Sequence, residues 1–100
     1  MNDAVWRQEV TAGAGQNSSP ILIPAWVNEV TVRALPGGGG TANVQHSLDD
    51  PDNLTDWSDW DEGSVSVPTT QALLGIVTAL RIQAVTAAAT MQVTGRRLRQ

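Results

Sequence analysis

The sequence predicts an all-β fold, an antiparallel β-sandwich with jelly-roll or immunoglobulin-like Greek-key connections. Three observations support this prediction. Apolar and polar residues alternate with period two along several short runs. Clusters of glycine, proline and serine separate these runs at intervals of about 8–12 residues. No run shows the longer apolar period of a convincing long helix. About seven or eight short strands result, and a small open barrel is the alternative that periodicity does not exclude.

The first strand is expected at Val5–Thr11, where Trp6 starts one side and Val5 the other. A glycine- and serine-rich loop at 11–20 follows. The next run, Ile21–Ile23, ends at Pro24. Because proline lacks an N–H group, this run is expected to be an edge strand or the end of a strand.

Two alternating runs, Asn28–Leu35 and Thr41–Leu48, flank the glycines at 37–40. Alternation on both sides of a glycine turn favours an antiparallel hairpin. Four glycines are more than a tight turn requires. We therefore expect a turn that is either mobile or pressed closely against a neighbouring segment.

The second half begins with an acidic stretch, 49–63, which we expect to be a long loop that carries the chain between sheets. A short strand with Val65 and Val67 facing inward is expected at 64–68. The segment 69–75 is ambiguous between a helical turn and a strand. The remaining expected elements are a strand at 77–85, a strand at 89–95 and a basic tail at 96–100.

The size and composition predict a single domain, residues 1–100, and argue against an enzyme. Hydrophobic residues make up 41% of the chain, enough for one modest core. Cysteine is absent, His46 is the one histidine, and neither a Gly-x-Ser-x-Gly motif nor a phosphate-binding loop occurs. We therefore expect no catalytic residue, no cofactor and no metal.

The charge and hydropathy patterns bear on partners. Six arginines stand against ten acidic residues, so the net charge is −4. An acidic chain lacks the electrostatic footprint of a nucleic-acid-binding protein. The longest apolar stretch, 72–84, is interrupted by polar residues and is shorter than the roughly 20 residues that span a bilayer. The N-terminus has no export-signal pattern. We therefore expect neither a nucleic-acid nor a membrane partner, and synthesis in a bacterial cytoplasm.

The charges are segregated along the chain. Seven of the ten acidic residues lie between 49 and 62, and three of the six arginines lie in the last five positions. The run 49–56 is rich in oxygen ligands for calcium but does not fit the EF-hand pattern, and a solvated loop of Asx turns is the other interpretation. Attraction between the acidic loop of one copy and the arginine tail of another would favour a homo-oligomer.

Trp57 and Trp60 are two of the four aromatic residues and flank Ser58-Asp59. Two tryptophans near carboxylates could stack on sugar rings, or they could fill the core or a subunit interface. In an extended strand, positions three apart point to opposite faces, so at most one of the two would be buried. In a turn, the two could share a face.

Three segments of the second half resemble small virion proteins of tailed bacteriophages. These segments are Trp-Ser-Asp-Trp-Asp-Glu-Gly at 57–63, Val-Thr-Ala-Leu-Arg-Ile at 77–82 and Ala-Thr-Met-Gln-Val-Thr-Gly at 89–95. The likeness extends over about residues 41–95. It implies a β-sandwich and a non-enzymatic role in the virion, with many such proteins decorating or cementing the capsid shell. It brings no catalytic residues with it.

The resemblance leads us to expect a capsid decoration protein that contacts the major capsid protein or other virion proteins as a homo-oligomer. A neck or tail component (adaptor or baseplate) is one alternative. A carbohydrate-binding module for host attachment, using Trp57 and Trp60, is another. The candidate interface residues come from the N-terminal arm, the acidic tryptophan loop and the arginine tail: Val5, Trp6, Arg7, Trp57, Asp59, Trp60, Asp61, Arg96, Arg97 and Arg99.

Overall fold

The computed structural model of the chain describes residues 5–27, 29–73 and 77–97. Eight β-strands make up its regular structure, and no helix occurs in these ranges. No segment described is therefore a helix long and apolar enough to cross a membrane. The strands are β1 (Val5–Ala12), β2 (Ile21–Leu22), β3 (Glu29–Pro36), β4 (Ala42–Ser47), β5 (Ser58–Val65), β6 (Thr69–Leu73), β7 (Ala79–Ala84) and β8 (Ala89–Arg96).

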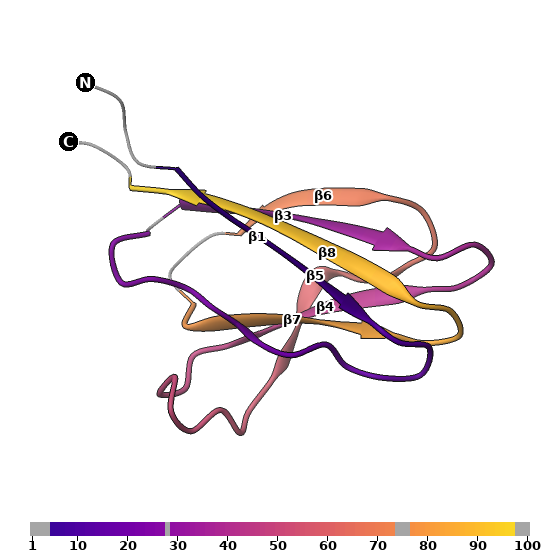
Figure 1. Cartoon of the computed structure of the whole chain (residues 1–100), viewed down its shortest axis with the longest axis horizontal. Helices are drawn as coiled ribbons and strands as arrows, with labels where there is room; N and C mark the ends of the chain where they lie inside the picture. Colours follow the sequence, from indigo (N-terminus) through magenta and orange to yellow (C-terminus); the bar gives the residue numbers. More distant parts are fainter. Residues whose placement is uncertain (1–4, 28, 74–76, 98–100) are drawn as a thin grey trace.

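The strands form two four-stranded antiparallel sheets, with the orders β1-β8-β3-β6 and β2-β7-β4-β5. The two sheets lie face to face, as Figure 1 shows. Strand pairs β1–β8, β2–β7, β3–β6 and β4–β5 are all neighbours. This nesting is that of a long hairpin rolled into two layers, which is the jelly-roll arrangement. The prediction of an all-β antiparallel sandwich is confirmed.

The core lies between the two sheets and follows directly from the period-two pattern. In β3, Val30, Val32 and Ala34 are buried while the residues between them face outward. The same alternation runs through β8, where Met91 and Val93 are fully buried. The second sheet contributes its largest buried side chains at positions Val44, Leu80, Ile82 and Trp60.

The predicted hairpin at 28–48 is wrong. Strands β3 and β4 belong to different sheets, so the glycine segment carries the chain across the sandwich. The acidic stretch was expected to make such a crossing, and that prediction is also wrong. It joins β4 and β5, which pair within one sheet. The two connections thus have the opposite roles: β3 pairs with the distant strands β8 and β6, whereas β4 pairs with the next strand, β5.

The glycine segment is pressed against the turn that joins β7 and β8. A Cβ atom on Gly37 would collide with the carbonyl oxygen of Ala88, and one on Gly40 would lie 2.8 Å from the Cβ of Ala87. Gly39 has φ of 77°, in the left-handed region that glycine favours. Of the two expectations for this turn, close packing against a neighbour is therefore the one observed.

The region around β5 and β6 also differs from the sequence prediction. β5 begins at Ser58, inside the stretch that was expected to be a loop. Val67 was expected to face inward from a strand at 64–68, but it lies in a bend and is 62% exposed. The ambiguous segment that follows is a strand, β6, as far as Leu73.

Candidate functional site

The outward face of the β1-β8-β3-β6 sheet, hereafter the open face, carries polar side chains in rows that cross the strands. The strand register places one residue from each of three or four strands in a row. From one end of the sheet to the other, the rows are Val5–Arg96–Glu29, Arg7–Thr94–Thr31–Ala72, Glu9–Gln92–Arg33–Thr70 and Thr11–Thr90–Leu35. Threonine is frequent here because its β-branched side chain suits an extended backbone.

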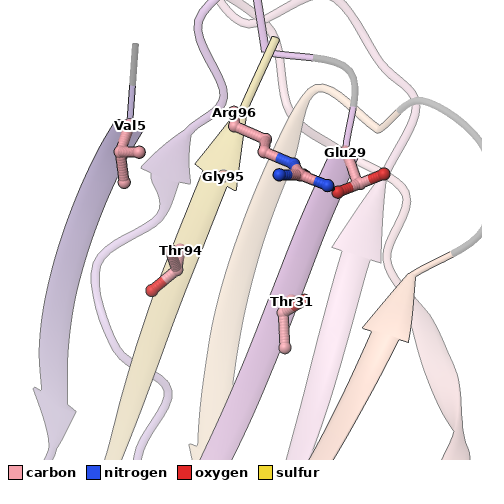
Figure 2. A pocket seen from close by; sticks show the side chains of 6 residues that line it. All are labelled: Val5, Glu29, Thr31, Thr94, Gly95 and Arg96. Atoms are coloured by element: carbon pink, nitrogen blue, oxygen red, sulfur yellow. Dashed lines mark hydrogen bonds and ion pairs between the residues drawn. The ribbon is translucent and has the colours of Figure 1, made fainter. Parts of the chain in front are cut away.

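Three of these rows are joined by side-chain hydrogen bonds. In the first row, Arg96 Nε donates to Glu29 Oε1 at 2.7 Å, and this contact is also an ion pair (Figure 2). In the third row, Gln92 Nε2 donates to Glu9 Oε1 at 2.8 Å, and Arg33 Nε donates to Thr70 Oγ1 at 3.2 Å. In the fourth row, the hydroxyls of Thr11 and Thr90 are 3.0 Å apart.

The second row, hereafter the open row, is different. Among the described residues, no side-chain hydrogen bond involves its polar members Arg7, Thr94 and Thr31. Shallow hollows lie along this row. One of about 230 Å³ is lined by Arg7, Thr31, Arg33, Thr70, Gln92 and Thr94. The next, of about 250 Å³, extends from Thr31 and Thr94 to Val5 and the Arg96–Glu29 pair (Figure 2).

The opposite sheet has an outward face whose polar groups are bound to one another. Asp59 Oδ1 accepts hydrogen bonds from Asn43 Nδ2 at 2.7 Å and from Gln45 Nε2 at 3.0 Å. These two bonds, with the one from Gln45 the larger influence, hold the pKa of Asp59 below its ordinary value. Arg81 Nε donates to Gln45 Oε1 at 2.8 Å. Burial lowers the pKa of Arg81, whose guanidinium lies 4.3 Å from the ring centre of Trp57.

The two tryptophans of the acidic loop are separated by the sheet. Trp60 is 3% exposed and packs in the core, where its Nε1 donates to the carbonyl oxygen of Gly63. Trp57 is half-buried and stacks on Arg81 on the outward face. The expectation that at most one would be buried is confirmed. Trp60 as an interface residue is a wrong prediction, because its side chain has almost no exposed surface.

The connection at 49–56, hereafter the acidic tip, is ordered by its own carboxylates. Asp49 Oδ2 accepts from the backbone N–H groups of Asp56 at 2.7 Å and Thr55 at 2.8 Å, and these bonds lower the pKa of Asp49. Asp50 Oδ1 accepts from the N–H of Asp52, which is an Asx turn. In the part of the chain that the structure describes, no group of three or more potential ligands could hold a metal ion.

The remaining candidate interface residues are scattered. Val5 and Arg7 are exposed on the open face, whereas Trp6 points inward and packs against the core beside Gly95. Asp59 and Asp61 are exposed on the other sheet. Arg97 is exposed, with its guanidinium 6.0 Å from the ring centre of Trp26, and Arg99 lies outside the described residues.

Sequence reasoning missed the residues around these hollows that lie on β3 and β8. Thr31 and Thr94 of the open row, and Arg33 of the third row, were not among the candidate interface residues. A pairing of those strands would have brought them together, but no local pattern encodes it. His46, the single histidine, points inward beside Leu80, and its buried Nδ1 has no hydrogen-bond partner within the part of the chain that the structure describes.

Comparisons with known proteins leave the function open. No family model and no curated protein sequence matches the chain. Among solved structures, a chain from "Bacillus endospore appendages form a novel family of disulfide-linked pili" aligns with 11% identity and a TM-score of 0.43, over 98% of this chain and 93% of that one. A carbohydrate-binding module (CBM6cm-2) of Cellvibrio mixtus lichenase 5A aligns with 11% identity and a TM-score of 0.34, over 99% and 91%. Likenesses this distant carry no functional argument.

Proposed function

We propose that the chain is a non-enzymatic structural protein of a tailed-bacteriophage particle, a capsid decoration or cement protein. It adheres to neighbouring proteins of the particle and holds them together. In this role, contact area and rigidity matter, and no bond is made or broken. The observation that carries the proposal is the open face, a broad, mostly polar surface with shallow hollows and one row whose polar side chains form no side-chain hydrogen bond with any other described residue.

The open face suits contact with another protein surface. Its strands are fixed by pairing on both sides of β8 and β3, so the side chains are presented on a rigid backbone. Threonine loses little rotamer freedom when it is covered, because its χ1 angle is already restricted. A wide face of this kind can bury several hundred square ångströms, whereas its hollows are too shallow to enclose a small substrate.

The likeness to phage virion proteins supports the assignment to a particle. The three segments that carry it fall on β5, on β7 and the residues before it, and on β8. They include the core residues Trp60, Ile82 and Met91, so they describe the framework of the sandwich. The same segments also contribute Thr94 to the open row.

Purified particles provide the test. A decoration protein should be present in many copies per particle, and particles that lack it should release their DNA at a lower temperature than complete ones. Thr94→Arg, in the middle of the open face, should abolish rebinding to depleted particles, whereas Ser66→Arg, in an exposed bend, should not. Absence of the protein from purified particles would refute the proposal.

A neck or tail component is the alternative within the same class, and copy number separates the two. A decoration protein coats the shell, whereas a neck or tail part occurs only in a few copies. The carbohydrate-binding alternative loses its basis in the geometry. Trp57 and Trp60 lie on opposite faces of their sheet and cannot form one platform for a sugar.

A further inference from the structure

We infer that the open row, together with Arg33 of the third row, binds the acidic tip of a second copy of this chain. The inference rests on the proposed function, since it names the neighbour that the open face contacts. The sequence suggested that the acidic residues of one copy attract the arginine tail of another. The contacts of the open face and those of the tail both favour the open face as the partner instead.

The acceptor surface has the chemistry of a carboxylate site. Arg7 and Arg33 line the same hollow, with the hydroxyls of Thr31, Thr70 and Thr94 around them. Guanidinium and hydroxyl groups both donate hydrogen bonds to carboxylates, and the charged donor strengthens such a bond. Among the described residues, neither glutamate of the open face forms an ion pair with these arginines, because Glu9 accepts from Gln92 and Glu29 pairs with Arg96.

The arginine tail is a less suitable binding site for carboxylates than the open face. Arg96 already forms an ion pair with Glu29 at 2.7 Å. Arg97 lies near the ring of Trp26. An incoming carboxylate would have to compete with these contacts, whereas among the described residues no carboxylate pairs with Arg7 or Arg33.

The acidic tip supplies the matching groups. Asp49 is committed to its own backbone, but the side chains of Asp52 and Asp56 are exposed, with no hydrogen bond described for their carboxylates. The tip projects from the end of β4, clear of the two layers (Figure 1). Its length and exposure allow it to enter a shallow hollow on another molecule.

The contact must be between molecules. The tip belongs to the β2-β7-β4-β5 sheet, whereas the open face points away from that sheet. One copy therefore offers both halves of the contact on different sides. Such a head-to-tail interface generates a closed ring or an open chain of copies.

Sedimentation velocity on the purified full chain tests the inference. At low salt we expect reversible self-association that weakens as salt rises, because exposed charges are screened over about 10 Å at 0.1 M. Arg33→Glu and Arg7→Glu should each weaken it about fivefold or more. Arg97→Glu makes the same change in net charge away from the open row and should leave it nearly unchanged.

A charge exchange provides the second arm. Asp52→Lys should weaken self-association as Arg33→Glu does. An equimolar mixture of the two variants should associate again, because the unchanged acidic tip of Arg33→Glu can bind the unchanged open face of Asp52→Lys, and the two exchanged charges also attract each other. A wild-type chain that stays monomeric at millimolar concentration would overturn the inference, as would a mixture that fails to associate.

The two proposals fail in distinguishable ways. If the wild type is monomeric but Arg33→Glu loses binding to depleted particles, the open face contacts a different virion protein, and only this inference falls. If the charge exchange succeeds but the protein is absent from particles, the copy-to-copy contact stands without the proposed function.

Discussion

The two connections at the ends of β4 are built in contrasting ways (Figure 1). The glycine turn before β4 is closed by backbone packing against Ala87 and Ala88, with no space for side chains at Gly37 and Gly40. The acidic tip after β4 is closed by side chains, chiefly Asp49, that bind backbone N–H groups. The first connection is part of the framework that holds the two sheets together. The second is attached to that framework and exposes its charges, which suits a contact surface.

Filling the glycine turn should have the largest effect. Gly37→Ala places a methyl group against the Ala88 carbonyl, and relief requires a shift of backbone at the crossing between sheets. We expect a loss of about 1–3 kcal/mol in the free energy of unfolding, as for overpacking elsewhere. Urea denaturation measures it. Gly38→Ala is the matched control, because no atom lies within 4 Å of its Cβ position, and its effect should stay within about 0.5 kcal/mol.

Equal effects of the two substitutions would mean that the glycine turn is not pressed against the β7–β8 turn. In that case, the two connections of β4 would differ in composition only.

A two-residue insertion should destabilise the fold more in the glycine turn than in the acidic tip, but by less than Gly37→Ala does. Two residues added between Gly38 and Gly39 break the turn in which Gly40 N–H donates to the Gly37 carbonyl at 3.0 Å. We expect a cost of about 1 kcal/mol from that bond and its packing. The same two residues between Asp52 and Asn53 lengthen an exposed loop and should cost less than about 0.6 kcal/mol. Thermal denaturation of both variants, compared at their midpoints, tests the difference.

The sequence predicts the strands of the fold better than it predicts which strands the connections join. Alternation in 28–35 and 89–95 was enough to predict β3 and β8, because the period of a half-buried strand is local. Pairing is not local. Glycines at 37–40 are compatible both with a hairpin and with a crossing, and only the contact with Ala87 and Ala88 decides between them.

The sequence predicted only part of the candidate site, for related reasons. Val5, Arg7 and Arg96 were candidates because of their place near the chain ends, and the structure puts them on the open face. Thr31 and Thr94 were not candidates, because outward-facing threonines are common on strands. Only the strand pairing, which places them in one row with Arg7, distinguishes them. Asp59 and Asp61 resembled loop residues because β5 is an edge strand with a polar outward side.

Acid should loosen the tip before the framework. Its hydrogen bonds lower the pKa of Asp49 in the folded chain, so the carboxylate stabilises the fold above the ordinary aspartate value of about 3.9. That stabilisation is lost as the pH falls through the lowered pKa. Asp49→Asn should therefore be less stable than the wild type at pH 7, by less than Gly37→Ala, and the difference should shrink below about pH 4. Urea denaturation at several pH values measures the difference, and a gap independent of pH would contradict this role of Asp49.

The smallest effect is expected where the acidic tip rejoins the sheet. Trp57 stacks on Arg81 there, at 4.3 Å from the guanidinium to the ring centre. A double-mutant cycle with Trp57→Ala and Arg81→Gln should give a coupling of about 0.5–1 kcal/mol, the range of a partly exposed cation–π contact. Trp57→Phe should retain part of it, since an aromatic face remains over the charge. A coupling of zero would mean that Trp57 does not anchor the tip, and that Asp49 alone distinguishes this end of β4 from the glycine end.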